Sequence, residues 1–158
     1  DFPDDMPVPQ VPLFIAGNKA QALLDTIPSE ESTGFVVIAA DTVVVLGNRI
    51  IGKPENEEDA KAILRELSGK VHRVITGAVL MTADHKEEIM EITEVHFHPL
   101  SDEQIAHYVE RYQPMDKAGA YAIQEWIGLV GIKKIDGDFY NVMGLPVNKV
   151  LQVLQKLI

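Results

Sequence analysis

The chain of 158 residues contains no cysteine. This absence excludes a disulfide framework and any metal site built on thiolates. Basic residues are also scarce, because 14 Lys and Arg stand against 24 Asp and Glu and give a formal net charge of −10 at pH 7. A surface of this sign repels nucleic acids and anionic membranes, so we expect neither as a partner.

Long apolar runs are missing as well. No stretch approaches the roughly 20 residues that cross a bilayer, and the opening DFPDDMPVPQ carries no signal-peptide pattern. Together with the lack of cysteine, this favours a cytoplasmic protein. The apolar content of 46% and the charged content of 24% are ordinary for a globular chain, and the length predicts a single domain over 1–158.

Apolar periodicity and turn residues predict helices that alternate with strands. Asn56 is the expected N-cap of one helix, and Ser101 with Gln104 forms the expected capping box of another. The combination predicts an α/β fold with a mixed sheet. Helices are predicted at 12–27, 56–67, 101–112 and 146–157, and strands at 34–40, 43–46, 49–51, 71–82, 89–98, 128–135 and 139–143, the last two as a hairpin.

Asp41 interrupts the β-branched run IAADTVVVLG. A carboxylate at the end of a buried strand is held rigidly at the edge of the sheet, where α/β clefts form. There it can hold Mg²⁺, which prefers one or two carboxylates completed by water and substrate phosphates. The alternative interpretation is an aspartate that forms a turn where one strand stops and another begins.

Two lysines are candidates for binding an anion. Lys53 stands between Gly52 and Pro54, where a point charge could meet a phosphate, although the Walker pattern is absent. Lys19 lies on the first predicted helix. The alternative for both is an exposed, solvated lysine.

The segment MDKAGAYAIQ, residues 115–124, has small side chains that would let its backbone pass close to a ligand, and Gln124 can both donate and accept hydrogen bonds. The alternative is a tight loop whose small residues serve packing. His96 and His98 share one face of a predicted strand, but no third metal ligand is evident, so we interpret them as part of a half-exposed edge strand.

Five motifs then occur in order: ADT, GKP, LSGKVHRVITG, PMDKAGAYAIQ and GDFYNVMGLP. In sequence and spacing they resemble the Maf family of nucleoside triphosphate pyrophosphatases, from about Ala16 to the C-terminus. The resemblance implies hydrolysis of a nucleoside triphosphate to the monophosphate and pyrophosphate, with Mg²⁺ or Mn²⁺ as cofactor. It also implies a mixed, bent sheet flanked by helices with a central cleft, as in Maf and ITPase proteins, and often a homodimer.

The resemblance carries roles onto individual residues. Asp41 matches the carboxylate that binds the metal or activates water, and Lys19, Lys53 and Gln124 match the other catalytic and substrate-binding polar residues. Thr42 directly after Asp41, together with the segment that ends at Gln124, is similar to the branch that cleaves dTTP and UTP. The branch acting on 7-methyl-GTP typically has Gln after that Asp.

One family feature does not occur in the sequence: no S-x-S-P-R-R turn precedes Lys19. We therefore expect a Maf-like domain that is N-terminally incomplete. Two other hypotheses stay open, a nucleotide-binding regulator of septum formation or cell division that does not turn over its ligand, and a generic α/β binding module.

Overall fold

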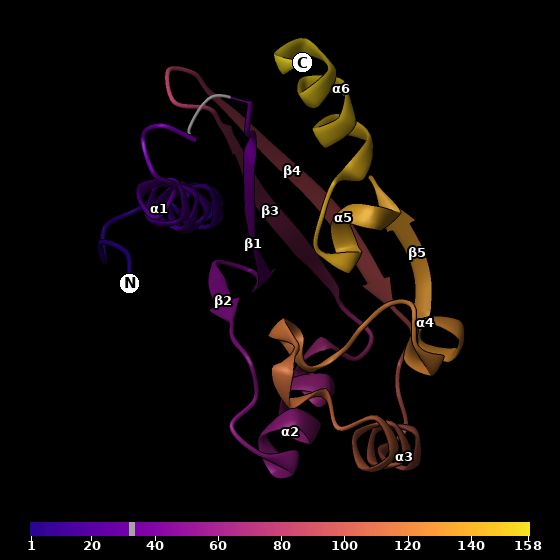
Figure 1. The fold of residues 1–158 in the computed structure, drawn as a ribbon. Helices are drawn as coiled ribbons and strands as arrows, with labels where there is room; N and C mark the ends of the chain where they lie inside the picture. Colours follow the sequence, from indigo (N-terminus) through magenta and orange to yellow (C-terminus); the bar gives the residue numbers. More distant parts are fainter. Residues whose placement is uncertain (32–33) are drawn as a thin grey trace.

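The computed structural model describes residues 1–31 and 34–158 (Figure 1). Its sheet has five strands in the order β2-β1-β3-β4-β5. The strands are β1 (Val37–Leu46), β2 (Arg49–Ile51), β3 (Val71–Met81), β4 (Lys86–Phe97) and β5 (Ile132–Asp136). The α-helices are α1 (Val11–Asp25), α2 (Glu57–Leu67), α3 (Asp102–Tyr112), α4 (Trp126–Gly131), α5 (Phe139–Met143) and α6 (Val147–Leu157), and the 3-10 turns are η1 (Val8–Gln10), η2 (Pro114–Asp116) and η3 (Ala118–Ala120).

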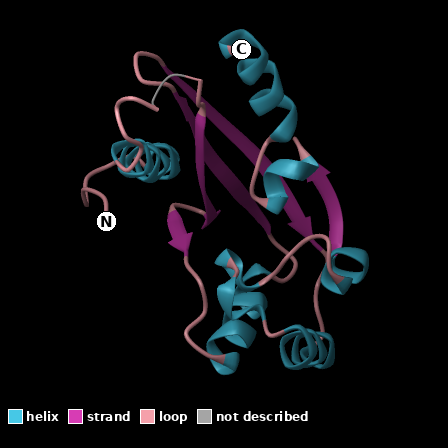
Figure 2. Ribbon diagram, in the orientation of Figure 1, coloured by secondary structure: helices cyan, strands magenta, loops and turns pink. Residues whose placement is uncertain are grey.

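Helices cover both faces of the sheet (Figure 1). Helix α1 lies on one face, α5 and α6 lie on the other, and α2, α3 and α4 gather at one end of the sheet (Figure 2). Within the described ranges, none of the helices combines the length and apolar character needed to span a membrane.

Strand alternation decides which side chains face which helix, because successive residues point to opposite faces. Val43 and Val45 of β1 pack with Val11 at the start of α1. On the opposite face, Ala78 of β3 packs with Val150 of α6. Asp41 therefore belongs to the α1 face and Thr42 to the other.

The largest core cluster lies at the end of the sheet occupied by α2 and α3. Leu64, Leu67 and Tyr108 are fully buried in it. The predicted helix starts are confirmed, since Asn56 Oδ1 accepts a hydrogen bond from the Asp59 N–H at 2.9 Å. Ser101 forms the complete capping box that opens α3.

Two predictions about the sheet are wrong. The mixed sheet is not found, because every pair of neighbouring strands in the described residues is antiparallel. The separate strands predicted at 34–40 and 43–46 are a single strand, since Asp41 and Thr42 continue the ladder opposite Gly77 and Thr76. Asp41 thus stands inside a strand and not at its end.

The predicted hairpin over 128–143 is also wrong. This segment forms α4, then β5, then the short helix α5. Asp138 caps α5 by accepting from the Tyr140 N–H at 3.3 Å. A run of five residues such as FYNVM is too short for periodicity to separate helix from strand.

Candidate functional site

Asp41 forms an ion pair with Lys19 on the α1 face of the sheet. Lys19 Nζ lies 2.7 Å from Asp41 Oδ1 and 3.4 Å from the carbonyl oxygen of Ala40. The Lys19 side chain is 53% exposed and that of Asp41 is 20% exposed. Such a pair contributes little to stability, at most about 1 kcal/mol, and both groups remain accessible to a ligand.

The other three predicted residues line a pocket of about 210 Å³ on the opposite face of β1. Thr42 contributes a hydroxyl, Lys53 an ammonium group and Gln124 an amide. The pocket also includes Lys117 and Tyr121, which sequence reasoning did not single out although both stand in the motif that ends at Gln124. Its apolar walls come from Val44, Val74, Ala118, Ala122, Val142 and Met143.

The Lys19–Asp41 ion pair and the pocket lie on opposite faces of β1, beside its outer edge. Strand β2 pairs only with the last residues of β1, Val44 to Leu46. Over the described part of the chain, the outer edge of 37–43 therefore has no strand partner. Lys53 follows two residues after β2, and it lines the same pocket as Thr42. Asp41 and Lys53 are not joined by any ion pair or hydrogen bond in the described residues, so their convergence on one ligand stays a prediction.

One wall of the pocket is formed by residues from the 115–124 segment, which is hydrogen-bonded to the residue directly after β2. The N–H of Gly119 donates to the carbonyl oxygen of Gly52 at 3.2 Å, directly before Lys53. Gly119 has φ +74°, and a Cβ there would lie 3.0 Å from the side chain of Val44. Glycine is therefore required for the loop to approach β1 so closely. The contact fixes the distance between the Lys53 and Gln124 sides of the pocket.

A buried polar pair supports the same loop from below. Nε2 of His72, on β3, lies 2.6 Å from the hydroxyl oxygen of Tyr121, and both rings pack against Phe97. Burial lowers the pKa of His72 from 6.5 to about 4, with His96 a smaller cause. Burial also raises the pKa of Tyr121, so its hydroxyl stays protonated. The pair is therefore neutral at physiological pH, and His72 supports the loop as a buried structural residue.

This shift predicts a pH dependence of stability. Between pH 6.5 and pH 4 the unfolded chain binds a proton at His72 that the folded chain does not, so the free energy of unfolding falls as the pH falls. We expect a loss of about 2 kcal/mol between pH 6.5 and pH 5, measured by urea unfolding across that range. His72→Gln should flatten this slope, whereas His98→Gln, at an exposed histidine, should retain it. An unchanged slope in His72→Gln would contradict the assignment.

A divalent cation would have few protein ligands here. The described residues contain no group of three or more His, Asp or Glu side chains arranged to hold a metal. His96 does not lie on an edge strand as predicted, because β4 is paired on both sides at this residue, with β3 and with β5. Asp41 alone still suits Mg²⁺, which takes one or two carboxylates and completes its shell with water and substrate phosphates.

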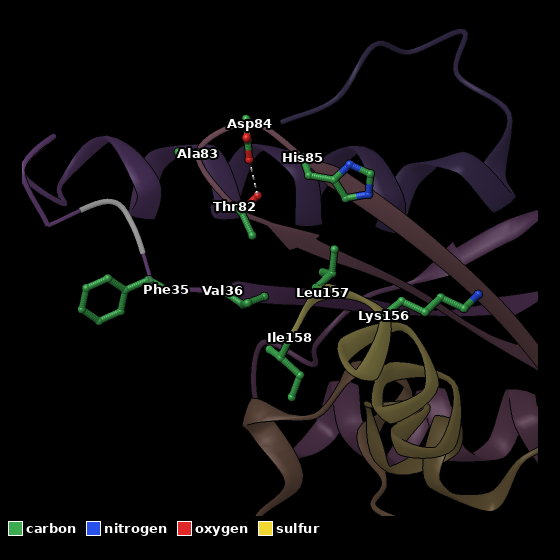
Figure 3. A pocket seen from close by; sticks show the side chains of 10 residues that line it. Phe35, Val36, Thr82, Ala83, Asp84, His85, Lys156, Leu157 and Ile158 are labelled. Carbon is green, nitrogen blue, oxygen red and sulfur yellow. Dashed lines mark hydrogen bonds between the residues drawn. The ribbon is translucent and has the colours of Figure 1, made fainter.

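A larger cavity of about 710 Å³ lies far from these residues, between the end of α6 and the β3–β4 turn (Figure 3). Phe35, Leu157 and Ile158 give it an apolar lining. The Asp84 carboxylate in its lining already accepts a hydrogen bond from the hydroxyl of Thr82 at 3.2 Å. None of the predicted site residues lines this cavity, so its size does not make it the candidate site.

The comparisons with known proteins agree with the motifs. The model of the family described as "Maf-like protein" matches residues 3–157. The chain belongs to the Maf family. A relative from Phocaeicola vulgatus is 47% identical over 156 residues, which are 99% of this chain and 79% of that protein. One from Bacteroides thetaiotaomicron is 46% identical with the same coverage, and one from Cytophaga hutchinsonii is 47% identical over 94% of this chain and 66% of its own length. All three carry the name dTTP/UTP pyrophosphatase.

Proposed function

We propose that this Maf protein hydrolyses dTTP and UTP to the nucleoside monophosphate and pyrophosphate. The observation that carries the proposal is the placement of two polar groups at one open strand edge. Asp41 with Lys19 lies on one face of β1, and the pocket that contains Thr42, Lys53 and Gln124 lies on the other. Membership of the family and the names of the relatives support this activity.

The pocket is the natural place for the base. Its volume of about 210 Å³ suits one small ring, and its apolar walls, among them Val44 and Val74, can hold an aromatic face. The triphosphate would then run along the edge of β1 toward Asp41. Lys53 has no ion-pair partner among the described residues, since the carboxylate in the pocket lining, Asp116, pairs with Lys117, and so Lys53 can offer its charge to the phosphates. In this proposal the predicted central cleft consists of the pocket and the edge together.

The reaction joins a water oxygen to the α-phosphorus and breaks the bond from that phosphorus to the bridging oxygen, so that pyrophosphate leaves. Asp41 would take the proton of the attacking water or hold the cation through its carboxylate. Lys19 and Lys53 would stabilise the negative charge that builds on the leaving group. When bound, a divalent cation supplies further charge neutralisation and lowers the pKa of its water. Positioning and charge are what phosphoryl chemistry chiefly needs.

The test is a product assay on the 158-residue chain. dTTP, UTP, CTP and 7-methyl-GTP would each be incubated in Mg²⁺ and in Mn²⁺, with the monophosphate and pyrophosphate both quantified. We expect equal amounts of the two products from dTTP and UTP. Release of a nucleoside diphosphate and orthophosphate would contradict cleavage between the α and β phosphates. Binding of these nucleotides without any product would favour the regulatory hypothesis.

A further inference from the structure

Gln124 stands on a tight turn of the chain. The N–H of Glu125 donates to the carbonyl oxygen of Ala122 at 3.1 Å, which closes a β-turn with Ile123 and Gln124 as its two central residues. Ala122 and Ile123 are buried, whereas Gln124 is exposed. The Gln124 amide has no hydrogen-bond partner among the residues that the structure describes. Its position at the pocket therefore depends on how firmly the turn itself is held.

One side chain joins both ends of this turn. The hydroxyl of Tyr108, on α3, accepts a hydrogen bond from the Ala122 N–H at 3.1 Å and donates one to Glu125 Oε1 at 2.6 Å. The hydroxyl thus serves as donor and acceptor at once. Tyr108 is fully buried, and this burial, followed by the hydrogen bond to Glu125, raises its pKa. The hydroxyl therefore keeps the proton that it donates.

The start of α4 packs closely against the same turn. The N–H of Gly128 donates to the carbonyl oxygen of Glu125 at 2.9 Å, and a Cβ on Gly128 would lie 1.9 Å from the carbonyl oxygen of Ile123. Ile123 and Ile127 belong to the largest core cluster. The backbone on both sides of Gln124 is thus fixed by close packing against α4 and by the two hydrogen bonds of Tyr108.

We propose that the Tyr108 hydroxyl is a positioning group for nucleotide binding, which holds the turn of residues 122–125 so that Gln124 meets the ligand in the pocket. This inference rests on the proposed function and adds a residue outside the pocket on which the affinity for the nucleotide depends. Tyr108 does not line the pocket, so it acts only through the turn. Without its hydroxyl the buried Ala122 N–H loses its partner, and the turn can adopt other arrangements. The apparent affinity falls with the fraction of molecules whose turn is correctly placed.

The experiment is a double-mutant cycle between Tyr108 and Gln124, read in the dissociation constant for UMP by calorimetry. Tyr108→Phe removes only the hydroxyl and should weaken UMP binding by about five- to tenfold, as expected for the loss of one hydrogen bond. Gln124→Ala removes the group that the turn presents. In that background Tyr108→Phe should change the dissociation constant by less than about twofold, because the second residue acts only through the first.

Further variants separate positioning from general stability. Tyr112 stacks on Tyr108 with ring centroids 5.1 Å apart, and its hydroxyl has no hydrogen bond among the described residues. Tyr112→Phe is therefore the matched control and should leave the affinity unchanged. Glu125→Ala should weaken UMP binding as Tyr108→Phe does, whereas Glu125→Gln keeps an acceptor for the hydroxyl and should restore most of the affinity. Glu125 is only half-buried, so its variants test the inference even where Tyr108→Phe lowers the folded fraction.

Turnover gives the same comparison for UTP. Gln124 lines the pocket on the face of β1 opposite Asp41, so we expect its contact to be equally strong in the bound substrate and in the transition state. In Tyr108→Phe the KM for UTP should therefore rise by the same factor as the dissociation constant for UMP, while kcat stays within about twofold. A defect that merely unfolds part of the protein would lower the apparent kcat and leave KM unchanged.

Two results would overturn the inference. Unchanged affinity for UMP in Tyr108→Phe is one, and a loss of equal size with and without the Gln124 side chain is the other. A chain that shows the expected cycle with UMP but releases no pyrophosphate from UTP would refute the proposed function and retain the inference. A chain that cleaves UTP with the same KM in Tyr108→Phe would do the reverse. A chain that neither binds UMP nor cleaves UTP would refute both.

Discussion

Asp41→Asn should lower the rate of pyrophosphate release from dTTP by about a thousandfold, within the range usual for a general acid or base. Asparagine has the shape of aspartate but carries no charge, so it can neither take a proton from water nor neutralise a cation. The side chain is 20% exposed beside the open edge of β1, where a phosphate can reach it. The measurement is kcat at saturating nucleotide, with pyrophosphate as the readout.

Folding should be nearly unaffected by this change. The variant loses the ion pair with Lys19, which is partly exposed and contributes at most about 1 kcal/mol. Thermal unfolding should therefore show a similar melting temperature, which separates a chemical defect from a structural one. The matched control is Asp84→Asn, at an exposed carboxylate in the β3–β4 turn, which should keep full activity. Substantial turnover by Asp41→Asn would remove Asp41 from the mechanism.

The interpretation of Asp41 shows what a sequence pattern does and does not determine. The run of β-branched residues predicted Asp41 at the end of a strand, and this prediction is wrong. The strand does not stop there, since Asp41 continues the ladder opposite Gly77. The edge is open because β2 covers only the last three residues of β1. Whether a residue of β1 has a strand partner depends on the length of β2. The composition of the segment around Asp41 does not indicate that length.

Helix starts were predictable because their signals are local. The side chain of Asn56 caps a backbone N–H three residues away, and Ser101 does the same. The short helix α5 was not predictable, because the bonds that place its Asn141 come from Val74 and Glu91, 67 and 50 residues away in the chain. The antiparallel order of the sheet likewise follows from such distant pairings.

The candidate site also has a part that the sequence could predict and a part that depends on distant contacts. The motifs identified Thr42, Lys53 and Gln124, and the fold brings all three to one pocket. The separation of Asp41 from Thr42 onto opposite faces could have been derived from strand alternation only if the strand had been recognised as continuous. The contribution of Tyr121 depends on its buried contact with His72, 49 residues away.

Gly77→Ala should lower the free energy of unfolding by about 3 kcal/mol or more, at the upper end of the usual cost of overpacking. A Cβ on Gly77 would lie 2.3 Å from the backbone nitrogen of Leu13 and 2.4 Å from its Cα. These are backbone atoms of α1, so no side chain can rotate away to make room. The helix would have to lift from the sheet, which would expose apolar residues and displace Lys19 from Asp41, the cross-strand partner of Gly77. Urea unfolding measures the loss, and the activity of the remaining folded fraction should fall with it.

Gly17→Ala on the same helix is the matched control. A Cβ there would have only the flexible end of Lys86 nearby, at 3.8 Å. Because alanine restricts the unfolded chain and favours helix, this variant should be more stable by about 0.5–1 kcal/mol. The two substitutions add the same methyl group to the same helix–sheet interface, and opposite signs are expected because only one of them meets backbone. Equal stability of Gly77→Ala and the unaltered chain would mean that α1 does not rest on β3 at this point, and the geometry of the Lys19–Asp41 pair would then have no fixed support.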